Sequence, residues 1–148
     1  MALEKLRSAW EDILNPVLGS LSGVKPSTVT WVALPIGILG GLAVLTAEDS
    51  AYGANMLFGG ALLIIMAMIL DGLDGPLARK YGNVTRWGAY LDHTFDRLLD
   101  AVWILCISGS VFVGDFTLGL VAAWVTLLGS YMGTQSQSVA GSRNSPRF

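Results

Sequence analysis

Two uncharged apolar stretches, residues 29–47 and 52–70, constrain most strongly what this chain can fold into. A transmembrane helix needs about 20 predominantly apolar residues to cross a hydrocarbon core roughly 30 Å thick, and each stretch has that length. Two further apolar stretches follow at 88–113 and 116–132, the first of them with acidic residues in its first half. The pattern predicts an all-α fold, a polytopic membrane helix bundle with about four transmembrane helices. The third helix crosses the membrane only if its charged half is buried in protein or faces water.

The composition agrees with a membrane protein and excludes several other classes. Hydrophobic residues make up 53% of the chain and charged residues 14%, whereas a soluble domain has about 25% charged residues. Intrinsic disorder and a highly charged nucleic-acid binder are excluded, and the net charge of −2 produces no field that attracts a polyanion. The single cysteine excludes a disulfide framework and a cysteine-based zinc site. We therefore expect no nucleic-acid partner.

The N-terminal segment has the periodicity of an amphipathic helix rather than the apolar core of a signal peptide. Apolar residues recur in positions 2–18 at three- and four-residue spacing, with charged residues between them. We expect an interfacial helix on the membrane surface; the alternative is a helix packed on a soluble partner. The expected organisation is a single membrane domain over 1–148, with the interfacial helix and linker at 1–25, the transmembrane bundle at 26–135 and a polar cytoplasmic tail at 136–148.

The placement of the basic residues predicts the orientation in the membrane. They lie before the first apolar stretch, between the second and third, and after the fourth: Lys5, Arg7, Lys25, Arg79, Lys80, Arg86, Arg143 and Arg147. The opposite connections contain Glu48, Asp49 and Asp115 and no basic residue. By the positive-inside rule, both termini and the 79–88 connection are cytoplasmic.

Glycines in the first two apolar stretches predict close helix contacts, because glycine lets two backbones approach. They are Gly37, Gly40 and Gly41 in the first stretch and Gly59 and Gly60 in the second.

Four aspartates occupy helical spacings on either side of the 79–88 connection. Asp71 and Asp74 are three residues apart, and Asp92 and Asp96 are four residues apart. Residues at these spacings share a helix face. Because a short connection makes the two helices antiparallel neighbours, we expect the four carboxylates to converge near the cytoplasmic surface.

Such a cluster favours a divalent metal ion. Charged aspartates in a membrane helix are costly, and close like charges oppose each other's ionisation. Mg²⁺ or Mn²⁺ relieves both costs because hard cations prefer oxygen ligands, and two ions suit a phosphoryl transfer. The alternative is that the aspartates simply pair with nearby basic residues, and for Asp100 a pair with Arg97 is as good an explanation as a supporting role at the site.

Small residues and an arginine beside the aspartates indicate a ligand. Gly75 and Ala78 leave room for a flat group against the backbone, and Gly72 and Pro76 are expected to loosen the helix end. Arg79 offers a planar set of donors to phosphate.

At this point the sequence resembles the CDP-alcohol phosphotransferases, whose signature is D-x2-D-G-x2-A-R-x8-G-x3-D-x3-D. Every fixed position is matched, by Asp71, Asp74, Gly75, Ala78, Arg79, Gly88, Asp92 and Asp96. Upstream, the run from Pro26 to Thr30 is similar to the opening of the family's first span.

The resemblance implies transfer of a phosphatidyl-type group from a CDP-linked lipid alcohol to a small alcohol or phosphorylated polyol, with release of CMP. It implies that Asp71, Asp74, Asp92 and Asp96 ligate the metals and that Asp96 is the general base. Asp71, Asp74, Gly75, Ala78 and Arg79 would hold the CDP group, with Thr30 as a weaker contact. Gly88 would let its helix approach the site closely. A homodimer is also plausible for this family.

The sequence departs from the family in two places. It runs out after the fourth apolar stretch, whereas family members usually have two more spans, so we expect a form that lacks the last two transmembrane helices. Residues after Tyr131 are polar but uncharged, where members that use a phosphorylated acceptor have basic residues. Arg86, Arg97 and Tyr131 are the candidate residues on the acceptor side, and Arg143 is, with Arg86 and Arg97, a candidate replacement for the missing basic residues. A non-catalytic membrane subunit and, less favoured, a cation transporter stay open as alternatives.

Overall fold

The computed structural model describes residues 14, 16, 18–82 and 84–143, with side chains described as far as residue 139. The predicted interfacial helix lies almost entirely outside the described residues. Leu14 and Leu18, near the end of that segment, are buried against Val29, Leu73 and Leu77. The Tyr81 hydroxyl also donates to the Leu18 carbonyl at 2.9 Å.

Four helices and no strand form the described part of the chain. They are α2 (Pro26–Leu45), α3 (Ala51–Lys80), α4 (Arg86–Gly109) and α5 (Phe116–Arg143). By length and composition, α2, α3 and α5 are apolar enough to cross a membrane. The prediction of an all-α, polytopic membrane bundle is confirmed.

Local sequence signals mark where the helices begin. Pro26 occupies the first turn of α2, where its missing N–H costs no intrahelical bond. The Ser50 and Thr85 hydroxyls cap α3 and α4, accepting from the backbone N–H of Gly53 at 3.0 Å and of Gly88 at 2.9 Å.

Two helices extend further than their apolar stretches indicate. The α3 helix continues through Gly72 and Pro76 to Lys80, so the expected loosening at these residues does not interrupt it. The α5 helix continues past residue 132 to Arg143, which makes the first part of the polar tail helical. Helix propensity and capping, rather than hydropathy, determine where a helix ends outside the apolar core.

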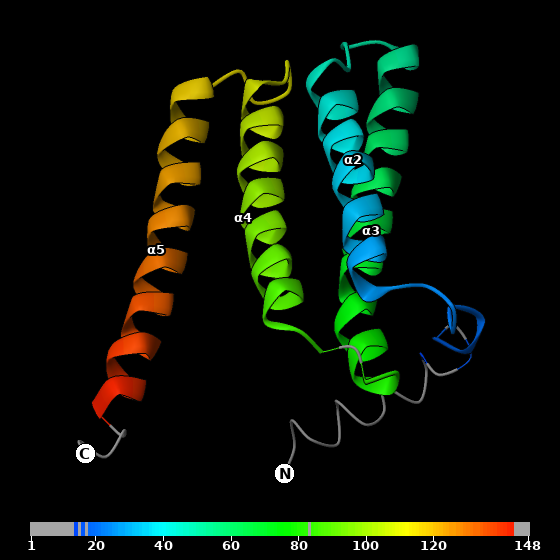
Figure 1. The fold of residues 1–148 in the computed structure, drawn as a ribbon. Coiled ribbons are helices and arrows are strands. Elements are labelled where there is room, and N and C mark those ends of the chain that lie inside the picture. The colour runs from blue at the N-terminus through cyan, green and yellow to red at the C-terminus, as the bar shows by residue number, and fades with distance from the viewer. Residues whose placement is uncertain (1–13, 15, 17, 83, 144–148) are drawn as a thin grey trace.

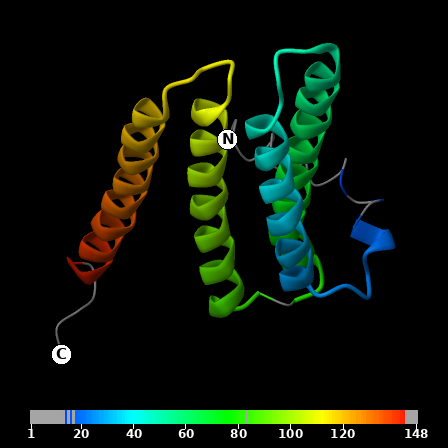
Figure 2. The same ribbon diagram turned by 90° about the horizontal axis from the view of Figure 1, so that it is seen from above.

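The helices lie in the order α5, α4, α2, α3, as the two views in Figure 1 and Figure 2 agree. The α2 helix therefore packs against both α3 and α4, and α5 packs on α4. The start of α2, the end of α3 and the start of α4 meet at the same end of the bundle, the lower end in Figure 1.

Glycine contacts hold α2 against its neighbours, as predicted. A Cβ on Gly40 would lie 2.9 Å from the Ile64 backbone nitrogen, and one on Gly60 would lie 2.9 Å from the Gly40 carbonyl oxygen. A Cβ on Gly37 would overlap Leu99 of α4. Gly59 is the exception, because nothing lies within 4 Å of a Cβ placed there.

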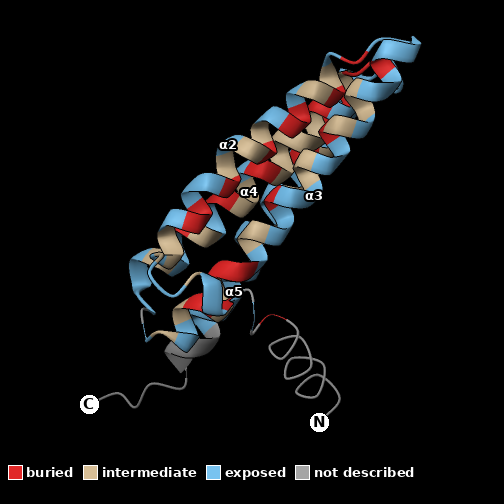
Figure 3. Ribbon diagram, turned by 90° about the vertical axis from the view of Figure 1, so that its right-hand side faces the viewer, coloured by how far each residue is buried: buried red, intermediate tan, exposed pale blue. Residues whose placement is uncertain are grey.

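Burial follows the surfaces where α2, α3 and α4 meet (Figure 3). The Trp103 indole N–H of α4 donates to the Gly37 carbonyl at 2.9 Å. Large apolar side chains such as Phe58 of α3 and Trp124 of α5 are exposed on the outside. Small residues between the helices and large apolar side chains on the outside form the arrangement that a lipid environment favours.

Gly60→Ala is expected to destabilise the bundle by about 1–3 kcal/mol, because its methyl group would meet the backbone of α2. Gly59→Ala is the matched control. It is expected to be neutral or stabilising by roughly 0.5–1 kcal/mol, since alanine is the better helix former. Thermal unfolding in detergent measures both, and equal effects of the two substitutions would contradict the packing described.

Candidate functional site

Three carboxylates converge where α3 ends and α4 begins. Asp71 and Asp74 lie one turn apart on α3, and Asp92 lies in the second turn of α4. One oxygen from each lies within 4.8 Å of the others. The spacing predicted this convergence, and Asp96 also lies close enough to Asp71 to interact with it.

The α2 helix contributes a hydroxyl to this group. Thr30 Oγ1 donates to Asp74 Oδ2 at 2.6 Å, and these two residues are among the most buried polar residues described, with exposed fractions of 3% and 8%. The short bond to a charged acceptor fixes the Asp74 carboxylate between α2 and α3. Thr30 therefore positions a member of the cluster, whereas the resemblance alone implied a contact with the nucleotide.

Asp96 lies next to this group rather than in it. It follows Asp92 by one turn of α4, and its carboxyl group is close enough to that of Asp71 to interact with it. The Arg97 guanidinium pairs with both Asp96 and Asp100. The pairing of Asp100 with Arg97 that the sequence left open is therefore present.

The donor set fits a hard divalent cation. The three carboxylates repel one another, and the burial of Asp74 reduces the water that could offset this repulsion. Two oxygens bound to one octahedral Mg²⁺ lie about 3 Å apart when adjacent and about 4.2 Å apart when opposite, so the three carboxylates move inward to share one ion. All three donors are carboxylate oxygens, the ligands that Mg²⁺ and Mn²⁺ prefer.

A pocket of about 490 Å³ opens on one side of the carboxylates. This volume is within the usual range for small-molecule sites. Its lining comes from the start of α2, the end of α3 and the start of α4: Lys25, Pro26, Ser27, Thr30, Asp74, Gly75, Ala78, Arg79, Val84, Thr85, Gly88, Ala89 and Asp92.

The pocket combines a cation-binding side with an anion-binding side. Asp74 and Asp92 bring negative charge to the lining, and Lys25 and Arg79 bring positive charge to it. The first turns of α2 and α4 also line it, and helix N-termini attract anions through their dipoles and unpaired N–H groups. A ligand carrying a pyrophosphate with divalent cations satisfies both sides.

The small motif residues keep this space open. A Cβ on Gly75 would lie 3.4 Å from Arg79 Nη1, so the arginine side chain lies over the glycine. Gly88 lines the pocket, and outside the backbone of its own helix the atom near a Cβ placed on it is Thr85 Oγ1, at 3.1 Å. No side chain of another described helix comes within 4 Å of that position, so space at the pocket stays open there. The role expected for Gly88, a close approach of its helix to the site, stays a prediction.

The residues expected on the acceptor side are not brought together. Neither Arg86 nor Tyr131 is among the described residues that line the pocket. Tyr131 is exposed on α5, and its hydroxyl accepts from Gln135 Nε2 at 3.2 Å. Arg97 is engaged with its two aspartates. Arg143 lies beyond the residues whose side chains are described.

Sequence reasoning assigned no site role to Lys25, Thr85 or Ala89. All three line the pocket because two helices start there. The sequence does contain a sign of where these helices begin: Pro26 is typical of a first helical turn, that of α2, and Thr85 is a typical cap residue, here of α4.

Comparison with known proteins finds a family model, CDP-alcohol phosphatidyltransferase, that matches residues 24–139. A phosphatidylinositol phosphate synthase of Cutibacterium acnes is 39% identical over 101 residues, which cover 67% of this chain and 45% of that protein. An archaetidylinositol phosphate synthase of Pyrococcus horikoshii is 37% identical over 140 residues, covering 91% of this chain and 66% of that protein. No solved structure matches.

The chain spans less than two thirds of the length of these relatives. The matched region nevertheless contains α2, α3, α4 and most of α5, together with every residue of the carboxylate group and the pocket. The family resemblance inferred from the aspartate motif is confirmed. This chain belongs to the CDP-alcohol phosphatidyltransferase family.

Proposed function

We propose that this chain transfers a phosphatidyl-type group from a CDP-linked lipid alcohol to the hydroxyl of a small acceptor, with release of CMP, in phospholipid biosynthesis. The observation that carries the proposal is the group formed by Asp71, Asp74 and Asp92 beside a pocket lined with cations. Family membership supplies the reaction class to which that geometry belongs.

The pocket is proposed to hold the CDP group of the donor. Arg79, Lys25 and the first turns of α2 and α4, all in the lining of the pocket, are proposed to bind the phosphates. Gly75 and Ala78 leave the backbone of α3 accessible to a flat group such as the base or ribose. Thr30 keeps Asp74 in place beneath them.

Asp71, Asp74 and Asp92 are proposed to hold Mg²⁺ or Mn²⁺, with Asp96 beside Asp71 as the further carboxylate that a second ion needs. Bound divalent ions neutralise the pyrophosphate and make its phosphorus a better electrophile. The charge of the carboxylate group and the hardness of its donors support this assignment.

Asp96 is proposed to be the general base. It takes the proton of the acceptor hydroxyl while the acceptor oxygen bonds to the lipid-side phosphorus. The bond from that phosphorus to the bridging oxygen breaks, and CMP leaves. Asp96 suits this role because it lies next to the three-carboxylate group without belonging to it, and a half-exposed position lets an acceptor reach it.

The names of the relatives describe synthases of phosphorylated inositol lipids. We therefore extend the proposal to a phosphorylated polyol, such as inositol phosphate, as the acceptor. The choice of acceptor rests on the names of the relatives and not on the pocket, because the residues expected on the acceptor side do not line it. The proposed reaction class does not depend on this choice.

Purified protein in liposomes with Mg²⁺ or Mn²⁺ and a CDP-linked lipid is expected to release CMP when a suitable acceptor is present. Asp96→Asn is expected to lower turnover by at least about 100-fold because no base accepts the proton. Binding of CDP should remain. CMP is measured with inositol phosphate and unphosphorylated alcohols as alternative acceptors.

Asp49→Asn, at the opposite end of the bundle, is the charge-matched control for this experiment. Folded parent protein that releases no CMP with any acceptor would contradict the enzyme assignment and favour a non-catalytic membrane subunit. Asp96→Asn with parental turnover would contradict the role of Asp96 alone.

Thr30→Val is expected to weaken Mn²⁺ binding by about 10- to 100-fold, because it removes the 2.6 Å bond that orients the buried Asp74 carboxylate. Thr30→Ser retains the hydroxyl and should stay near the parent value. Titration followed by the electron paramagnetic resonance of free Mn²⁺ gives both affinities. If Thr30→Val bound Mn²⁺ as tightly as the parent protein, the Thr30–Asp74 hydrogen bond would not be needed to position Asp74.

The site and both termini are proposed to face the cytoplasm, and the placement of basic residues supports this orientation. In a Cys106→Ser background, a membrane-impermeant maleimide added to intact cells should label Asp49→Cys and not Gln137→Cys. Permeabilised cells should label both variants. The reverse pattern in intact cells would place the site on the outer face. The expected homodimer stays a prediction.

A further inference from the structure

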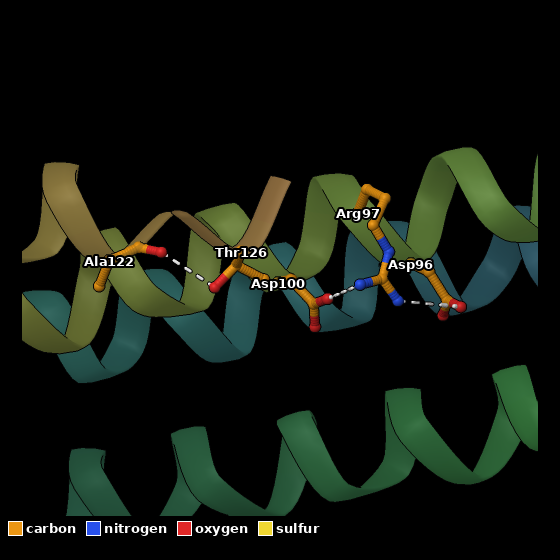
Figure 4. Close-up of polar contacts among 5 residues, drawn as sticks. All are labelled: Asp96, Arg97, Asp100, Ala122 and Thr126. Atoms are coloured by element: carbon orange, nitrogen blue, oxygen red, sulfur yellow. Dashed lines mark hydrogen bonds and ion pairs between the residues drawn. The ribbon is translucent and has the colours of Figure 1, made fainter. Parts of the chain in front are cut away.

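Arg97 of α4 bridges two aspartates of its own helix (Figure 4). Its Nη1 lies 2.9 Å from Asp100 Oδ2, and its Nη2 lies 3.6 Å from Asp96 Oδ2. The three side chains are each about one third exposed, so they lie at the edge of the bundle rather than in its core.

The two ion pairs of Arg97 differ in length: the pair with Asp100 is short and the pair with Asp96 is long. Asp100 is three residues further along the helix, a spacing that brings side chains together, and its distance is that of a strong charged hydrogen bond. Asp96 is the immediate neighbour of Arg97, and adjacent residues on a helix normally point about 100° apart. Arg97 therefore reaches Asp96 by folding back while Asp100 holds its guanidinium.

Asp96 needs such a partner because its other neighbours are negative. It interacts with Asp71 across the gap between α4 and α3, and Asp92 lies one turn away on the same face of α4. With a side chain 35% exposed, an unrestrained Asp96 carboxylate would turn toward solvent, away from this repulsion. The ion pair with Arg97, whose guanidinium is held by Asp100, restrains the carboxylate and offsets part of the repulsion from Asp71.

Both described ion pairs of Arg97 lie within α4, whereas Asp96 also interacts with Asp71 of α3. On the adjacent helix α5, Thr126 donates its hydroxyl to the Ala122 carbonyl of its own helix at 2.9 Å (Figure 4). Arg97 thus contacts Asp96 directly, from the same helix.

We propose that Arg97 and Asp100 are positioning residues for the reaction: Asp100 anchors the Arg97 guanidinium, and the second arm of the guanidinium holds the Asp96 carboxylate at the place where it receives the acceptor proton. The inference rests on the proposed function of Asp96. A base that is oriented by a third group is the arrangement that general-base catalysis requires. This role differs from the acceptor contact expected for Arg97 from the sequence.

The test is a double-mutant cycle in liposomes with a CDP-linked lipid and Mn²⁺. Arg97→Gln and Asp100→Asn are each expected to lower kcat by about 10- to 100-fold, the loss that a misplaced reacting group produces. The KM for the CDP-linked lipid should stay within about twofold of the parent value. Because Asp100 acts through Arg97, the double variant should be no slower than Arg97→Gln alone.

Three controls separate positioning from damage to the fold or to the metal site. Asp100→Glu should restore part of the lost kcat, and Glu48→Gln, at the far end of the bundle, should leave it unchanged. Thermal unfolding should change little, because exposed ion pairs contribute little to stability. In Arg97→Gln, the first Mn²⁺, held by Asp71, Asp74 and Asp92, should bind with the parent affinity in an electron paramagnetic resonance titration, whereas Asp92→Asn should lose affinity.

Parental kcat in Arg97→Gln would overturn the inference while leaving the proposed function intact, provided that Asp96→Asn is inactive. Losses that multiply in the double variant would also overturn it, as would weaker binding of the first Mn²⁺ in Arg97→Gln. Parent protein that releases no CMP would overturn the proposed function and this inference together.

Discussion

Mutual repulsion among carboxylates at one end of the bundle is the interaction on which the rest of the structure depends. Asp71, Asp74 and Asp92 offer oxygens within 4.8 Å of one another, from two helices. Such a group persists only if the helices are held rigidly together and positive charge is available nearby. The glycine packing of the bundle, the Thr30 bond and the basic residues of the pocket each meet part of this requirement.

The packing of α2 connects the fold to the site. Gly40 and Gly60 let α2 and α3 approach at the level of their backbones, and Gly37 receives the indole N–H of Trp103 from α4. The α2 helix thus sets the spacing between the two helices that carry the aspartates. At its first turns it also delivers Thr30 to Asp74 and lines the pocket.

Helical periodicity was enough to predict which aspartates share a face, and the short 79–88 connection was enough to predict that the two faces meet. Periodicity does not determine how far α4 is displaced along its axis relative to α3, and Asp92 lies with Asp71 and Asp74 while Asp96, one turn further along α4, interacts with Asp71. The same limit applies to Gly59 and Gly60: one points outward and the other into α2, and only packing distinguishes them. The bond from Thr30 to Asp74 could not be predicted either, because it joins residues 44 positions apart on different helices.

The central claim is that Asp71, Asp74 and Asp92 form one divalent-cation site between α3 and α4. Anomalous scattering from crystals grown with Mn²⁺ tests it most directly, because the signal locates the ion without reference to activity. The account predicts an anomalous peak about 2.1 Å from an oxygen of each of the three carboxylates. Well-diffracting crystals in saturating Mn²⁺ with no peak among these residues, or with peaks only elsewhere, would contradict it.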